Sequence, residues 1–270
     1  MSFTDTEDGE RIFYRVAGDE GAERTVVLIQ GLALSHRFWF TIPDDLASDP
    51  QRPRRVIALD NRGTGQSSRA KPPYSMKRLA ADIACVMRAA KVDKATLVGI
   101  SMGGMIAQHV ALKHPELVRG LVLMATTPGL PHGRLPSPKT IATLLTIGAG
   151  RDRGGKLTAS LLLPPSEMHR AREHFAGWLE EMRASPPSPA SFAGQMAAIA
   201  GHSTGFSLGK IRVPTVVVTG DADVLVPPKN SHVLAKAIAN ARLEILPGVG
   251  HGIPMLDKLV VRRALESIDS

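Results

Sequence analysis

The chain of 270 residues is 43% hydrophobic and 21% charged, with a net charge of +8 at pH 7. This composition is ordinary for a globular protein, and the length suits one large α/β domain with an inserted subdomain. No run of about 18 apolar residues occurs, which excludes a transmembrane helix. The basic residues are scattered without interleaved aromatics, so we expect neither a membrane nor a nucleic acid as partner.

The single cysteine, Cys85, excludes an internal disulfide bond and favours a reducing compartment. Residues 1–5 lack the basic and apolar segments of a secretory signal. From these two features we expect a cytoplasmic protein.

The first half of the chain alternates strand patterns with helix patterns. Residues 10–16 alternate apolar and polar, which is typical of a half-exposed strand near a sheet edge. Continuous apolar runs, typical of strands buried on both faces of a parallel sheet, cover residues 25–29, 56–59, 95–98 and 118–124. Helical patterns cover residues 38–47, 75–90 and 102–113. This alternation predicts an α/β fold with a doubly wound, mostly parallel sheet, whose functional loops lie at the carboxyl ends of the strands.

The strand patterns stop between residues 127 and 208. Proline clusters there separate helical stretches such as 139–147 and 166–183. We interpret this region as a helical cap insertion over the carboxyl edge of the sheet. The alternation then returns with strands predicted at 213–219 and 241–246 and helices predicted at 231–239 and 254–268. The expected domains are a core of residues 1–126 and 209–270 and a cap of residues 127–208.

Ser101 stands at the apex of a Gly-x-Ser-x-Gly sequence between a predicted strand and a predicted helix. A turn this tight strains the backbone and brings strand and helix close together, so Gly99 and Gly103 must be small. The turn would hold a hydroxyl in the open at the carboxyl end of a strand, as a nucleophile requires. Because so short a motif also occurs by chance, the rest of the chain must show whether Ser101 is a catalytic nucleophile.

A serine hydroxyl becomes a good nucleophile only beside a base that is itself oriented by an acid. Among nine histidines, His251 alone follows the last predicted strand in a glycine-rich loop at the same sheet edge. The loop after the preceding strand carries Asp221 and Asp223. Either carboxylate could orient the imidazole, and the other could brace the turn.

The order Ser, Asp, His, each in a loop after a strand, resembles that of the α/β-hydrolase superfamily. The likeness covers nearly the whole chain, and the motifs that carry it are Asp60-x-Arg62-Gly63-x-Gly65-x-Ser67, Gly99-Ile100-Ser101-Met102-Gly103-Gly104, Gly220-x-x-Asp223 and Gly250-His251. The resemblance implies Ser101 as nucleophile, His251 as base and, from the family spacing Gly-x-x-Asp, Asp223 as the acid. It implies no metal and no cofactor.

Members of this family usually carry His-Gly-x after the third strand, where this chain has Gln30-Gly31-Leu32. The resemblance implies an oxyanion hole made by the backbone N–H groups of Leu32 and Met102. Gln30, which carries both donors and an acceptor, can brace the loop as the histidine does in the family, or contact the substrate. We therefore take Gln30 and Gly31 as candidate substrate contacts.

The predicted cap is rich in Leu, Ile and Met, which predicts an apolar, adaptable pocket. Candidate contacts are Leu144 and Leu145 from the cap and Trp39 after the oxyanion loop. Each of these side chains could equally serve internal packing.

The layout resembles serine carboxylesterases and lactonases of the 3-oxoadipate enol-lactonase type, so we expect a hydrolase of small-molecule esters or lactones. A C–C bond hydrolase, a cofactor-free haloperoxidase or perhydrolase and a proline iminopeptidase use the same triad. Outside enzymes, the alternative is a small-molecule receptor on a hydrolase fold. Dehalogenase and epoxide hydrolase activities are disfavoured, because the members of the superfamily with these activities carry aspartate at the position of Ser101.

Overall fold

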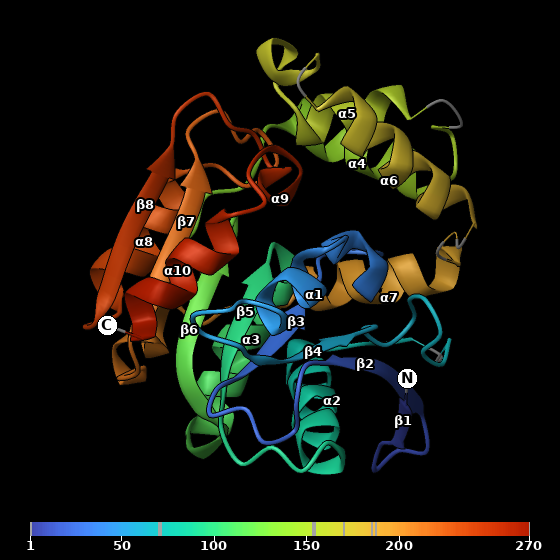
Figure 1. Ribbon diagram of the computed structural model, residues 1–270. Helices are drawn as coiled ribbons and strands as arrows, with labels where there is room; N and C mark the ends of the chain where they lie inside the picture. The colour runs from blue at the N-terminus through green and yellow to red at the C-terminus, as the bar shows by residue number, and fades with distance from the viewer. Residues whose placement is uncertain are drawn as a thin grey trace.

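The computed structural model describes residues 2–69, 72–152, 155–169, 171–184, 186 and 188–269. The strands of this part of the chain are β1 (Ser2–Asp5), β2 (Arg11–Ala17), β3 (Thr25–Ile29), β4 (Arg55–Leu59), β5 (Ala95–Ile100), β6 (Val118–Met124), β7 (Thr215–Gly220) and β8 (Ala241–Leu246). They form one eight-stranded sheet in the order β1-β2-β4-β3-β5-β6-β7-β8 (Figure 1). The β1–β2 and β2–β4 pairs, at one edge, are antiparallel, and the five remaining pairs are parallel. The predicted doubly wound, mostly parallel sheet is confirmed.

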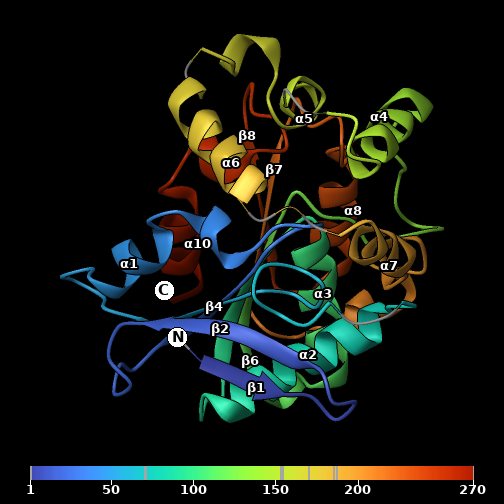
Figure 2. The ribbon, with the colours of Figure 1, turned by 90° about the vertical axis from the view of Figure 1, so that its right-hand side faces the viewer.

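Helices cover both faces of the sheet (Figures 1 and 2). One face carries α2 (Met76–Ala89), α3 (Met102–Lys113) and α8 (Lys229–Ala237), and the other carries α1 (Ile42–Ala47) and α10 (Val260–Asp269). Successive residues of β3 point to opposite faces, so Val27 packs with the first set of helices and Leu28 with the second. Both side chains are fully buried, which explains the continuous apolar run in the sequence.

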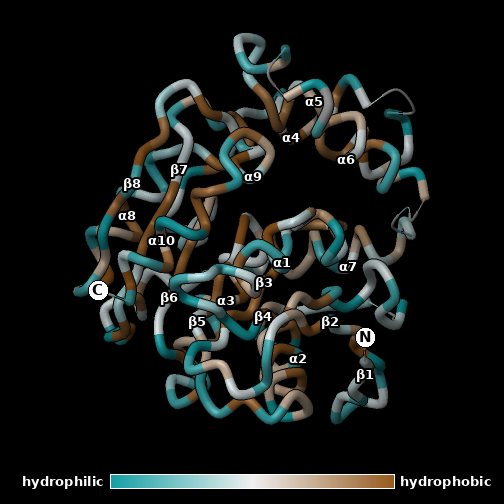
Figure 3. The backbone as a smooth tube through the Cα atoms, viewed as in Figure 1, coloured by the Kyte–Doolittle hydropathy of each residue, from teal (hydrophilic) through white to brown (hydrophobic). Residues whose placement is uncertain are grey.

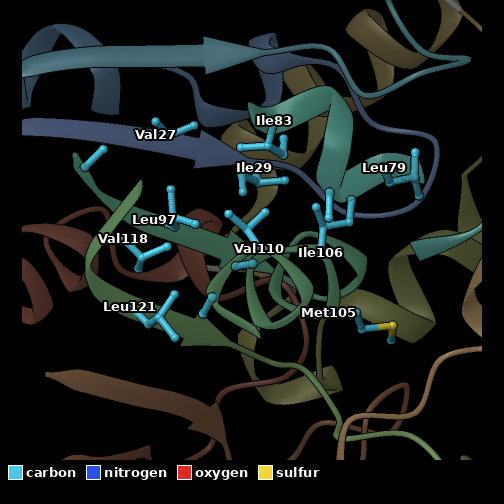
Figure 4. Close-up of a cluster of buried hydrophobic side chains, with 14 of the residues drawn as sticks. Val27, Ile29, Leu79, Ile83, Leu97, Met105, Ile106, Val110, Val118 and Leu121 are labelled. Atoms are coloured by element: carbon cyan, nitrogen blue, oxygen red, sulfur yellow. The ribbon is translucent and has the colours of Figure 1, made fainter. Parts of the chain in front are cut away.

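The hydrophobic residues concentrate along the central strands and on the helix faces that cover them (Figure 3). Figure 4 shows one of these layers, in which Ile29 and Leu97 from the sheet meet Ile106 and Val110 of α3. Ile83 of α2 lies in the same cluster. Burying such side chains stabilises the fold by about 1.5–3 kcal/mol each, and it fixes α3 directly behind the turn that carries Ser101.

Four helices stand between β6 and β7 in the described part of the chain: α4 (Pro138–Gly148), α5 (Lys156–Leu162), α6 (Arg172–Ala184) and α7 (Pro189–Ala200). We call them the cap helices. Figure 1 shows α4, α5 and α6 above the carboxyl ends of the strands, whereas α7 lies lower, close to the sheet. None of the described helices is long and apolar enough to cross a membrane.

Several predicted helices have different bounds in the structure. The stretch 38–47 is a short 3-10 helix (His36–Trp39) followed by α1, because Phe40 between them adopts a left-handed φ of 51°. The stretch 166–183 is a 3-10 turn (Pro165–Glu167) and then α6. The stretch 254–268 divides into α9 (Ile253–Leu256) and α10, because Asp257 is extended. Further 3-10 turns cover Pro115–Leu117 and Gly205–Lys210.

Candidate active site

Ser101 lies between β5 and α3 with a backbone conformation that side chains rarely adopt, at φ 54° and ψ −119°. The strand β6 and the residues after it hold this turn on both sides. The Ser101 N–H donates to the Met124 carbonyl at 2.9 Å, and the Thr126 hydroxyl donates to the Ser101 carbonyl at 2.7 Å. These bonds offset the strain that the turn costs and keep the serine at the carboxyl end of the sheet.

The two motif glycines are required by close backbone packing. A Cβ at Gly103 would lie 2.0 Å from the Ile29 carbonyl oxygen, and a Cβ at Gly99 would lie 2.3 Å from the Gly103 carbonyl oxygen. Strand β3, strand β5 and helix α3 therefore meet at distances that no side chain permits. This contact brings the segment after β3 against the serine turn.

His251 and Asp223 form a buried pair, with His251 Nδ1 lying 2.8 Å from Asp223 Oδ2. The other oxygen of Asp223 accepts from the backbone N–H groups of Leu225 and Val226, each at 2.8 Å. Asp221 instead accepts from the Gly248 N–H at 2.7 Å, near the surface. Between the two aspartates left open by the residue pattern, the structure joins Asp223 to the histidine and gives Asp221 the bracing contact.

No hydrogen bond joins Ser101 Oγ to His251 within the described residues, although both residues line one cavity. Nδ1 of His251 faces a carboxylate, which only accepts, so in the neutral ring the proton belongs on Nδ1 and the free lone pair on Nε2. The imidazole is thereby fixed in the tautomer that can accept a proton from a hydroxyl.

The segment Gln30-Gly31-Leu32 follows β3 and lies against the serine turn. A Cβ at Gly31 would be 3.3 Å from Ser101 Cβ. The N–H of Met102 stands at the first position of α3, where no carbonyl of that helix can accept from it. Among the described residues, the Leu32 N–H also donates to no acceptor. Two unpaired amides thus flank the serine, where an oxyanion hole is expected.

The cavity in front of Ser101 has a volume of about 710 Å³. Its lining is mostly apolar, and each cap helix contributes to it. The contributing side chains include Ile141, Leu144, Leu161, Trp178, Met182 and Met196. The cap helices and the carboxyl ends of the strands thus enclose one site of a size suited to a small organic molecule.

Two of the predicted substrate contacts do not reach this cavity. Leu145 is 53% exposed, because it lies about 100° around α4 from Leu144, which does line the cavity. Trp39 is fully buried in the core on the α1 side of the sheet, while its neighbours Phe38 and Phe40 line the cavity.

The motif Asp60-x-Arg62-Gly63-x-Gly65-x-Ser67 builds the scaffold rather than the cavity wall. Asp60 accepts from the N–H of His36 at 2.7 Å and lies 2.8 Å from His36 Nδ1. Ser67 donates to the Asp60 carbonyl and accepts from the Phe13 N–H. Arg62 pairs with buried Asp82 at 2.7 Å and also bonds Asp8, and burial raises the pKa of Asp82.

Two further supporting residues were not predicted from the sequence, and one of them, Gln195, lies far from the motifs in the chain. Gln195 of α7 accepts from the Ala33 N–H and donates to the Arg62 carbonyl, both at 2.8 Å. It ties the segment that follows β3 to a cap helix. Asn61 donates to the Gln30 carbonyl at 2.9 Å. For Gln195, the signal available in the sequence was a single amide side chain among the mostly apolar residues of α7.

His202 lines the cavity but is satisfied within the protein. Its Nε2 lies 2.9 Å from the Thr127 carbonyl and its Nδ1 lies 3.2 Å from His109 Nε2. Burial lowers the pKa of His202 to about 4, so the ring is neutral at pH 7. Within the described residues, no group of three or more His, Cys, Asp or Glu side chains could hold a metal ion.

Comparison with known proteins places this geometry in a family. Relatives that cover most of the chain include two with different descriptions. A protein of Pseudomonas savastanoi pv. phaseolicola (strain 1448A / Race 6), named "Putative carbamate hydrolase RutD", is 28% identical over 242 residues, 89% of this chain and 91% of that protein. A protein of Synechocystis sp. (strain ATCC 27184 / PCC 6803 / Kazusa), named "Putative non-heme chloroperoxidase", is 30% identical over 251 residues, 87% of each chain.

Among solved structures, the enol-lactonase from Burkholderia xenovorans LB400 shares the fold with a TM-score of 0.78. It is 23% identical, and the match covers 98% of this chain and 96% of that one. The family model described as alpha/beta hydrolase fold matches residues 24–258, which include the serine turn, the Asp223 loop and His251. The chain therefore belongs to the α/β-hydrolase family.

Proposed function

We propose that this α/β-hydrolase is a serine hydrolase that cleaves carboxylic esters or lactones of small to medium, largely apolar substrates. The observation that carries the proposal is the His251–Asp223 hydrogen bond of 2.8 Å beside a cavity that Ser101 also lines. An acid, an imidazole in the right tautomer and a strained serine are the parts of acyl transfer.

The reaction begins when Ser101 Oγ attacks the carbonyl carbon and His251 Nε2 takes its proton. In free enzymes the hydrogen bond between these two groups is often long and tightens only with substrate. Asp223 holds the imidazolium that forms. The N–H groups of Leu32 and Met102 donate to the negative oxygen of the tetrahedral intermediate, where each such donor is worth about a hundredfold or more in rate.

His251 then gives the proton to the leaving alkoxide, which departs as an alcohol and leaves an acyl-enzyme on Ser101. A water molecule repeats the sequence, giving a carboxylic acid and free Ser101. With a lactone the alcohol and the acid are two ends of one product. The apolar walls of the cap helices stabilise the acyl or alcohol group of the substrate and exclude bulk water.

Carbamate hydrolysis is the second candidate, because the relatives named RutD carry that description. Its first step also attacks a carbonyl carbon that bears a heteroatom. The relative described as a chloroperoxidase makes halogenation the third candidate. These chemistries differ in the leaving group and the second nucleophile, which the triad does not determine.

A substrate panel separates the candidates. It contains p-nitrophenyl acetate and butyrate, lactones graded by ring substituent, an aryl carbamate, and a halogenation assay with hydrogen peroxide and bromide. We expect esters or lactones to give the highest kcat/KM, and Ser101→Ala to lower kcat by at least about a thousandfold. A preference for the carbamate would replace the proposed substrate class, and no turnover at all would support the receptor alternative.

A further inference from the structure

Gln30 is the polar side chain that the departure from the family pattern places in the site. It follows β3 directly, it is 3% exposed, and it lines the cavity together with Ser101 and His251. Its backbone is fixed, because its carbonyl accepts from Asn61 Nδ2 at 2.9 Å. The next residue, Gly31, packs on Ser101. The backbone of Gln30 is therefore held in place beside the nucleophile, and its side chain extends from there.

The orientation of the Gln30 amide follows from its neighbour. Gln30 Oε1 accepts from the Gly31 N–H at 3.1 Å. A backbone N–H can only donate, so the atom facing it must be the amide oxygen and not the nitrogen. The oxygen alone thus supplies the bracing contact in the loop, and the NH₂ group is free for another purpose.

Within the described residues, no atom accepts a hydrogen bond from Gln30 Nε2. Water can satisfy this donor before substrate binds, but a substrate that fills an apolar cavity displaces that water. A plain alkyl acyl group then leaves the NH₂ group unpaired, whereas an acyl group with its own oxygen satisfies it. Sites that hydrogen-bond a substrate discriminate strongly against analogues that lack the partner atom.

We propose that Gln30 Nε2 is a substrate hydrogen-bond donor that selects acyl groups bearing an acceptor oxygen close to the scissile carbonyl. This inference rests on the proposed function. The backbone amides of Leu32 and Met102 serve the oxyanion, and they act on any ester. Gln30 adds a preference among esters, and the substrate class becomes that of alkoxy-, oxo- or carboxy-substituted acyl compounds.

The test uses two esters of equal size, p-nitrophenyl butyrate and p-nitrophenyl methoxyacetate, which differ by one CH₂ replaced by an ether oxygen. The quantity is the ratio of kcat/KM for methoxyacetate to kcat/KM for butyrate. Comparing the ratio between variants cancels the intrinsic reactivity of the two esters. Gln30→Glu keeps the acceptor for Gly31 and removes the donor, and Gln30→Met removes both.

We expect both variants to lower this ratio by about tenfold, the loss of one hydrogen bond. The control Leu145→Met, at an exposed site outside the cavity, should leave it unchanged. If Gln30→Met does not fold, Gln30→Glu decides. An unchanged ratio, or an equal loss on both esters, would overturn the inference while leaving the hydrolase proposal intact. A wild-type enzyme that hydrolyses neither ester would instead contradict the proposed function.

Discussion

Asp221 and Asp223 lie two residues apart and have different partners. Asp223 is buried, contacts His251 and accepts from two backbone N–H groups, so its carboxylate is held in one geometry. Asp221 is exposed and caps the turn at Gly248. The two residues are therefore a matched pair for testing which carboxylate acts in catalysis.

Asp223→Asn should lower kcat by about ten-thousandfold, because an amide facing Nδ1 no longer fixes the tautomer or stabilises the imidazolium. Asp221→Asn should change kcat by less than about twofold, since it loses only a surface bond to the turn. Steady-state kinetics on p-nitrophenyl acetate measures both. Equal losses in the two variants, or a larger loss at Asp221, would contradict the assignment of the acid.

At the scale of residues, the sequence predicted the residues that belong to a motif. It did not predict which residues contact the cavity, because that depends on the direction in which each side chain points. The Gly-x-Ser-x-Gly turn pointed to Ser101 and the glycine-rich loop after the last strand pointed to His251, whereas the choice of Asp223 over Asp221 came from the family resemblance. Leu144 and Leu145 have the same chemistry, and only the rotation of α4 about its axis decides which one faces the cavity. That rotation depends on tertiary packing, which the local pattern does not contain.

At the scale of elements, the serine turn depends on three segments meeting without side chains. Gly103 lies on α3 against the end of β3, and its position leaves no space for a methyl group. Gly177 offers a contrast within a helix, because it lies exposed on α6 and an added Cβ would meet no atom within 4 Å.

Gly103→Ala should destabilise the protein by about 1–3 kcal/mol through overpacking and should also reduce activity, since β3 leads into the segment of the proposed oxyanion hole. Gly177→Ala should raise stability by about 0.5–1 kcal/mol, because alanine favours a helix. Urea unfolding measures both changes. A Gly103→Ala variant with unchanged free energy of unfolding and normal kcat would contradict the packing account of the turn.

The buried strands were the best-predicted elements, because strands covered on both faces leave continuous apolar runs. The 3-10 turn before α1 and the break before α10 were not predicted. The left-handed φ of Phe40 and the extended backbone of Asp257 cannot be inferred from the residue types. Within the cap, the predicted helix 139–147 agrees with α4 to within one residue at each end, whereas α5 and α7 were not predicted as separate helices.

At the scale of the whole molecule, His202 joins the sheet to the cap region. It bonds Thr127, just after β6, and His109 on α3, and it lines the cavity from the loop that follows α7. Burial holds its pKa at about 4, below the ordinary value of 6.5. Between these two pKa values, His202 is therefore neutral in the folded protein and protonated in the unfolded chain.

The sign of the pH dependence follows from this difference. Between pH 6.5 and about pH 4 the unfolded state binds the His202 proton and the folded state does not, so the free energy of unfolding falls as pH falls. His202→Gln should flatten this decrease, measured by urea unfolding at pH 7 and pH 5. His232→Gln, at an exposed site, supplies the control, and equal slopes for wild type and His202→Gln would contradict the account.

The central claim is that Ser101 is the nucleophile of an acyl-transfer site, and covalent labelling tests it most directly. The protein is treated with a fluorophosphonate, digested, and its peptides are analysed by mass spectrometry. The account predicts one adduct per chain on Ser101, loss of esterase activity in step with labelling, and no adduct in Ser101→Ala. An unlabelled wild-type protein that still hydrolyses esters, or an adduct on another residue, would contradict it.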